Sequence, residues 1–222
     1  GAAMALVRLR EPGTLVAFLL GLFFEAGVAL LERVQGRTGA VDRALSGGAF
    51  GLALPLFCYF VVTRACAASS VQAAAFPLAR HGMNRSGLML GLLLPASALG
   101  VAFAAASGIA VVTLTRGASD PAWVRDSLAS VWIGGVAACA YSAAFLGASA
   151  FGRRGQGRLW LLGADFLLGA GSSFLALPWP KGHVRNLLGG APVLELSQAA
   201  ALGVLLGTSF AFLWFASLRV ER

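Results

Sequence analysis

The chain has 222 residues, of which 58% are hydrophobic and only 12% are charged, and its mean hydropathy is +0.80. This composition is typical of a membrane protein and leaves no room for a folded aqueous domain. A net charge of +8 would suggest nucleic acid as the partner of a soluble protein, but here the basic residues lie between apolar runs, where they anchor helices, so we expect no nucleic-acid partner.

Six apolar runs fill most of the chain. A hydrocarbon core about 30 Å thick needs roughly 20 helical residues, so each run is long enough to cross a bilayer. Backbone groups must be paired within the membrane, which makes the spans helices. The sequence therefore predicts one all-α domain over residues 1–222, a polytopic membrane protein whose six transmembrane helices lie at about 14–31, 46–63, 86–115, 127–152, 159–177 and 193–218.

The basic residues favour an orientation in which both termini are cytoplasmic. With six spans the termini share one side, and that side carries ten basic residues against seven on the other. Loops rich in Lys and Arg face the cytoplasm. Every basic residue except Lys181 is arginine, a bias that indicates a GC-rich bacterial genome, so the expected location is the bacterial cytoplasmic (inner) membrane.

Two connections are more than linkers. Residues 64–85, on the predicted inner side, begin with an Ala-rich stretch that favours a helix over 65–75, which Pro77 then breaks or kinks. Residues 178–192, on the outer side, are framed by prolines and contain the apolar pair Leu187 and Leu188. This second segment predicts a short re-entrant or interfacial helix.

Two carboxyl groups lie away from the ends of the runs, where ionisable groups are costly and are usually paired or functional. Glu25 lies well inside the first run, where it could line a translocation path or bind a cationic group, or equally pair with Arg33 or Arg43. Asp165 lies only about 9 Å from the inner end of the fifth run, which favours a cross-helix partner or snorkelling. Its candidate partners are the inner arginines Arg64, Arg153 and Arg154.

The templates of catalysis do not fit this chain. A GxxxxGK[ST] nucleotide loop is impossible, because the only lysine, Lys181, does not follow a glycine. There is no HExxH motif, and two histidines, His81 and His183, cannot supply a His-rich metal site. Glu25 and Asp165 lie towards opposite faces, so they form no acid–base pair. We expect the chain not to be an enzyme and to hold neither a metal nor a cofactor of its own.

The inner connection ends in the sequence FPLARHGMNR at residues 76–85. A basic N-terminal segment leads into six spans, an inner helical segment joins spans 2 and 3, and proline-framed outer helices precede span 6. Together these features resemble the membrane subunits of type-2 ABC exporters, the ABC-2 permease family. In that family a P-L-x-R turn followed by a basic residue leads into span 3, as Pro77, Leu78, Arg80 and Arg85 do here.

The resemblance implies an exporter's permease subunit that moves a substrate with energy from a separate P-loop ATPase, which binds ATP and Mg. It implies an inner coupling helix between spans 2 and 3, short outer helices between spans 5 and 6, and pairing with a second copy or a related permease subunit. Spans 1, 2 and 5 would line the path, which makes Glu25, Tyr59 and Asp165 its polar candidates. The implied ATPase-coupling residues are Ala73, Phe76, Pro77, Leu78, Arg80 and His81.

The alternative hypothesis is a six-span membrane protein without ATP coupling through residues 64–85. It would be a substrate-binding subunit of the vitamin-capture type, or an assembly protein. Such a protein would retain a tightly bound small ligand, and variants of residues 64–85 would leave it unaffected. Membrane lipid surrounds the chain in either case.

Overall fold

The computed structural model describes residues 1–36, 39–82 and 84–220, and this part of the chain forms helices and no strand. Five of its helices are long and apolar enough to cross a membrane. They are Pro12–Val34, Ala40–Ala65, Gly87–Arg116, Trp123–Ala148 and Gln198–Arg219. The predicted all-helical fold is confirmed, and these helices indicate a multi-pass membrane protein.

The first half of the chain alternates long helices with short ones. In chain order its elements are α1 (Ala2–Leu9), α2 (Pro12–Val34), α3 (Ala40–Arg43), the π-helical η1 (Ala44–Ala53), α4 (Leu54–Ala65), α5 (Val71–Ala79) and α6 (Arg85–Arg116). Pro12 lies in the first turn of α2, where its missing N–H costs nothing, and Gly117 ends α6 with a φ of 90°. α3, η1 and α4 run on as one continuous helix.

The second half begins with a long helix and then becomes irregular. Its elements are α7 (Trp123–Ala148), η2 (Arg153–Gly155), α8 (Gly157–Leu168), η3 (Phe174–Ala176), α9 (Pro180–Leu187), η4 (Val193–Glu195) and α10 (Gln198–Val220). Between α8 and α10 the helices are short, because glycine, serine and proline interrupt the apolar pattern there.

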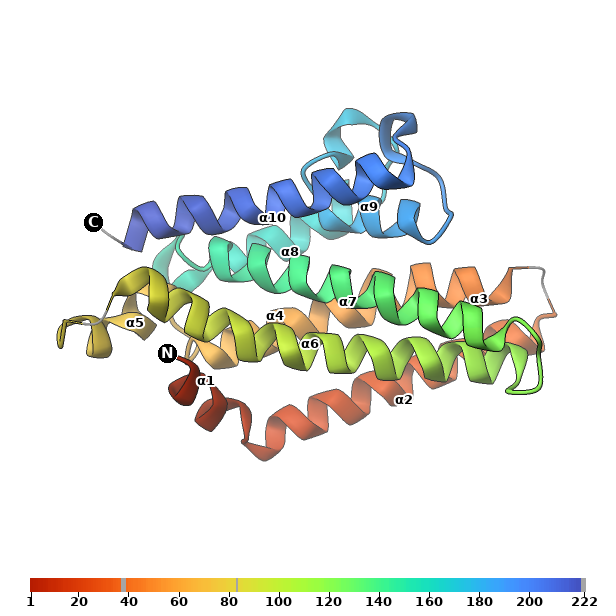
Figure 1. Ribbon diagram of the computed structural model, residues 1–222, viewed down its shortest axis with the longest axis horizontal. Helices are drawn as coiled ribbons and strands as arrows, with labels where there is room; N and C mark the ends of the chain where they lie inside the picture. Colours follow the sequence, from red (N-terminus) through yellow and green to blue (C-terminus); the bar gives the residue numbers. More distant parts are fainter. Residues whose placement is uncertain (37–38, 83, 221–222) are drawn as a thin grey trace.

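The long helices form a bundle whose two ends differ (Figure 1). One end holds both termini together with α1 and α5, and we call it the terminal end. The other end holds α3 and the loop between α6 and α7, and we call it the distal end. Both termini therefore lie at the same end of the molecule.

The core lies around α6 and α7, against which α2, α4 and α10 pack. Three aromatic rings join α2, α4 and α6: the ring of Phe57 stacks on that of Phe103 at 4.3 Å, and Phe18 meets both edge-on. Gly147 lets α10 approach α7 closely, because a Cβ atom there would lie 2.7 Å from the Phe212 carbonyl oxygen. On the outside, α2 exposes large apolar side chains such as Phe23, as a surface facing lipid requires.

The fifth predicted span, residues 159–177, is not one continuous helix. α8 has 12 residues and is about 18 Å long at 1.5 Å per residue. It ends at Leu168 because the next five residues, GAGSS, favour turns over helix. α9 then packs against η1, α7 and α10, and Leu187 at its end lines a cavity with Val41 and Arg116 at the distal end. Two short helices, α8 and α9, therefore take the place of the single helix predicted for the fifth span.

Candidate functional site

Asp165 joins three helices in the interior. Its side chain, on α8, is fully buried. Oδ2 accepts a hydrogen bond from the Tyr141 hydroxyl of α7 at 3.0 Å, and Oδ1 accepts one from the backbone N–H of Lys181 at 2.9 Å. Its partners are therefore a tyrosine and the start of α9, and the expected pairing with an inner arginine is wrong.

The N-terminus of α9 is suited to this carboxylate. Pro180 occupies the first turn and has no N–H, so Lys181 provides the first donor, and the positive end of the helix dipole favours an anion there. The Lys181 ammonium lies 4.4 Å from the centroid of the Phe166 ring, in a cation–π contact. Asp165 therefore connects α8 to the start of α9.

Arg158 binds the connection between α4 and α5. It is buried at the start of α8, and its Nη2 donates to the Ser69 carbonyl at 3.0 Å. Two further hydrogen bonds reinforce this contact: the Val71 N–H donates to Ser149 O at 3.3 Å, and Gln72 Nε2 donates to Ala150 O at 3.1 Å. The start of α5 is thus held to the turn between α7 and α8.

α5 has one buried face and one exposed face at the terminal end. Val71, Ala74 and Ala75 pack into the protein. Five of the six predicted coupling residues are exposed: Ala73, Phe76, Pro77, Arg80 and His81. The sixth is Leu78, whose side chain lies outside the described part of the structure. The same holds for the side chains of Met83 and Arg85, which belong to the same motif.

The predicted boundaries of this helix are wrong. The helix begins at Val71 rather than at residue 65, because Ala67 and Ala68 adopt left-handed conformations with φ of 51° and 52° after the end of α4. Pro77 lies inside the last turn, so the predicted break at this residue is wrong, and the helix stops two residues later at Ala79. Apolar composition alone does not reveal that the helix begins six residues later than expected.

Glu25 is buried in the interface between α2 and α6, where it is 1% exposed and lies against Ser107. Neither of its carboxyl oxygens has a hydrogen-bond partner of normal geometry in the described part of the chain. The arginines considered as partners bind elsewhere: Arg33 donates to Leu114 O at 3.0 Å, and Arg43 pairs with Glu32 at 2.9 Å. A membrane-embedded carboxyl without a cationic partner is a candidate functional group.

The three path candidates do not form one site. Tyr59, on α4, is half-buried, and its ring meets that of Phe145 edge-on at 5.8 Å. Phe145 in turn stacks on Tyr141 at 5.9 Å, so Tyr59 and Asp165 are joined through α7. Glu25 lies apart from them, between α2 and α6.

Sequence reasoning missed Tyr141 and Arg158. A tyrosine inside an apolar run was a detectable signal, because its hydroxyl needs a partner when buried. Arg158 and Asp165 are seven residues apart, which places them on the same face of a helix. That spacing could have indicated that α8 uses one face for both contacts.

Glu25→Met is expected to raise the Tm of the purified protein by roughly 2–12 °C. A buried carboxyl group without donors costs about 1–3 kcal/mol, and each kcal/mol corresponds to about 2–4 °C for a chain of this size. Thermal unfolding in detergent measures the effect, with Glu32→Met as the control that loses an ion pair and gains nothing. A fall in Tm for Glu25→Met would show that the carboxyl group has a stabilising partner.

Comparisons of the chain with protein-family models, with curated proteins and with solved structures found no match.

Proposed function

We propose that the chain is the permease subunit of an ATP-binding-cassette exporter in a bacterial inner membrane. The observation that carries the proposal is the short helix α5 with the turn that follows it: at the terminal end the helix exposes Phe76 and the turn exposes Arg80 and His81. Its opposite face is buried and its start is hydrogen-bonded to the turn between α7 and α8. A helix with this placement can receive a force from a partner protein and pass it to the bundle.

α8 is the element through which such a movement would reach the opposite end. Arg158 binds the α5 connection at one end of α8, and Asp165, about 10 Å further along at 1.5 Å per residue, binds the start of α9. A displacement of α5 would therefore shift α8 and α9 together, as a rigid-body transition between two arrangements. ATP and Mg²⁺ would be bound and hydrolysed by the partner ATPase.

The proposed orientation places the terminal end in the cytoplasm. The predicted inner segments of the sequence carry ten of the 17 basic residues, and two of these arginines, Arg153 and Arg154, are exposed. In this orientation α8 and α9 form a discontinuous fifth crossing. Irregular backbone is tolerated at membrane depth where protein covers it, and Arg185 supports this arrangement by donating to Gly171 O at 2.8 Å and to Ala191 O at 3.1 Å.

A functional exporter would contain a second copy of the chain or a related permease subunit. The proposed path is polar at few positions, namely Glu25, Tyr59 and Asp165. Of these, Glu25 is the one whose carboxyl oxygens lack a hydrogen-bond partner within the described residues, so it has capacity left for a substrate or an ion.

Purification of the tagged chain from its native membranes tests the proposal. We expect a P-loop ATPase to co-purify and to be identified by mass spectrometry. Placing two acidic residues in the exposed turn after α5, with Arg80→Glu and His81→Glu together, should reduce its recovery at least tenfold. Arg10→Glu, an exposed charge reversal at the same end of the bundle, is the matched control and should leave recovery unchanged.

Two outcomes would contradict the proposal. One is the absence of any P-loop ATPase from the purified material. The other is a small ligand that remains tightly bound in both the wild-type chain and the α5 variant, which would favour the substrate-binding alternative.

A further inference from the structure

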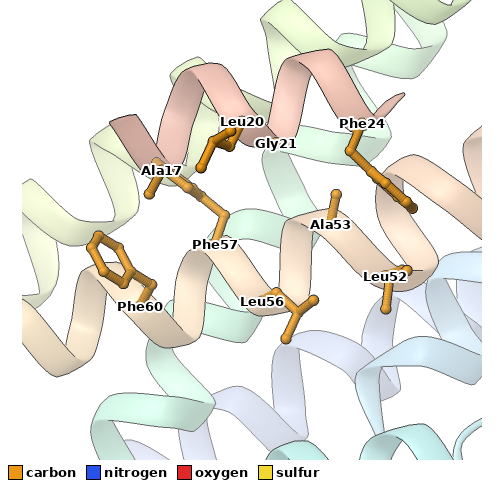
Figure 2. Close-up of a pocket in the computed structure, with 9 residues that line it drawn as sticks. All are labelled: Ala17, Leu20, Gly21, Phe24, Leu52, Ala53, Leu56, Phe57 and Phe60. Carbon is orange, nitrogen blue, oxygen red and sulfur yellow. The ribbon is translucent and has the colours of Figure 1, made fainter. Parts of the chain in front are cut away.

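A lateral groove on the bundle lies between α2 and the continuous helix of η1 and α4. It has a volume of about 310 Å³ and opens to the outside (Figure 2). Leu20 and Phe24 form one wall, Leu52 and Leu56 form the other, and every lining side chain is apolar. From Leu52 to Phe60 the groove follows eight residues, about 12 Å at 1.5 Å per residue, which is comparable to one leaflet of a hydrocarbon core about 30 Å thick.

A second cavity of about 340 Å³ meets this groove at its terminal end. Phe60 lines both spaces, so the two lie side by side at this residue. Unlike the groove, the second cavity is lined by charged side chains, namely those of Arg8, Glu11 and Arg64. The Arg64 guanidinium lies over the Phe60 ring, 5.3 Å from its centroid, and so stands at the junction of the two spaces.

The charge of this cavity is positive, since two guanidinium groups face one carboxylate. Arg64 pairs with Glu11, whose side chain is more than half exposed. Arg8 donates from Nη1 to Ala65 O at 2.7 Å, a neutral acceptor that leaves its charge uncompensated. A guanidinium has five N–H donors in a planar fork that fits a phosphate.

We infer that α1, α2 and α4 form a binding site for one anionic phospholipid, with an acyl chain in the groove and the phosphate at Arg8 and Arg64. The charge order fits this occupant: the basic cavity is at the end of a helix of membrane-spanning length, where headgroups lie, and the apolar groove extends from it towards the bilayer centre. The inference requires the chain to span a membrane and does not depend on an ATPase.

Glu11 has a definite role in this site. Its carboxylate occupies Arg64 when no lipid is bound, so the phosphate must displace it or share the guanidinium. Glu11→Gln removes the competing charge and leaves the cavity in place. We therefore expect this variant to bind the anionic lipid more tightly than the wild-type chain.

Native mass spectrometry of the chain in detergent, with equal amounts of phosphatidylglycerol and phosphatidylcholine added, tests the inference. The wild-type chain should retain one phosphatidylglycerol in preference to phosphatidylcholine. Two variants each alter one part of the site. Arg64→Ala removes the headgroup contact, and Ala17→Trp fills the groove. Each should lower phosphatidylglycerol retention at least fivefold, whereas Glu11→Gln should raise it at least twofold.

Matched controls are available on the same elements. Arg10→Ala removes an exposed charge next to the cavity, and Leu19→Trp adds an indole on an exposed face of α2 outside the groove. Both should retain the lipid as the wild-type chain does. Equal retention of the two lipids, or equal losses in the site and control variants, would overturn the inference. So would a change of oligomeric state in Ala17→Trp at unchanged lipid retention, which would assign the groove to a second copy of the chain.

Discussion

Asp165→Ala is expected to lower the free energy of unfolding by about 2–6 kcal/mol and to be the most damaging single truncation in the bundle. It leaves two buried donors unpaired, the Tyr141 hydroxyl and the Lys181 N–H, and each such loss costs about 1–3 kcal/mol. The Tm measured in detergent should fall by roughly 4–24 °C. Asp42→Ala, at an exposed carboxylate, is the matched control and should change stability by less than about 0.5 kcal/mol.

Two further variants separate the contacts of Asp165. Asp165→Asn keeps an oxygen for the Lys181 N–H and a group that Tyr141 can bind, so its cost should be less than half that of alanine. Tyr141→Phe removes one of the two hydrogen bonds and should cost about 1–2 kcal/mol. The double variant with Asp165→Ala should be less destabilised than the sum of the two single changes. Strict additivity would show that the two residues do not interact.

Arg158→Ala is expected to release the connection between α4 and α5 and to expose Cys66. Burial raises the pKa of the Cys66 thiol, so the wild-type chain should react slowly with maleimide at neutral pH. Without the guanidinium the Ser69 carbonyl loses its donor and the connection can open. In a Cys139→Ser background, which removes the exposed cysteine, the labelling rate of Cys66 should rise at least tenfold.

Internal controls make this result specific. Cys58 is buried in α4 and should remain unlabelled if the rest of the bundle is intact. Arg154→Ala removes an exposed arginine from the same turn and should leave Cys66 protected. Labelling of Cys58 and Cys66 at equal rates would indicate global unfolding, and an unchanged Cys66 rate in Arg158→Ala would show that the arginine does not hold the connection closed.

The long helices could be predicted from the sequence because hydropathy over about 20 residues determines whether a segment can cross a membrane. The break after Leu168 could not, because residues 169–177 are apolar enough for a span and only their glycines and serines oppose helix. The partners of Asp165 also escaped prediction. They come from α7 and α9, and three-helix contacts of this kind depend on packing rather than on spacing in one segment.

The features of the candidate sites, like those of the fold, could be predicted from the sequence only in part. Phe76 on α5 and Arg80 just after it are exposed, but their expected role in ATPase coupling stays a prediction. The isolation of Glu25 against Ser107 could not be foreseen, because nearby arginines offered equally good partners by sequence distance. The groove and its basic cavity arise from α1, α2 and α4 together.

The most direct test of the central claim is cross-linking from α5 in native membranes. A cysteine in place of the exposed Phe76, in the Cys139→Ser background, is treated with a thiol-to-amine cross-linker in inside-out vesicles, and the adduct is identified by mass spectrometry. The account predicts an adduct with a P-loop ATPase that forms from Phe76→Cys and not from the control Arg10→Cys. No ATPase in the adduct, or equal adducts from both positions, would contradict it.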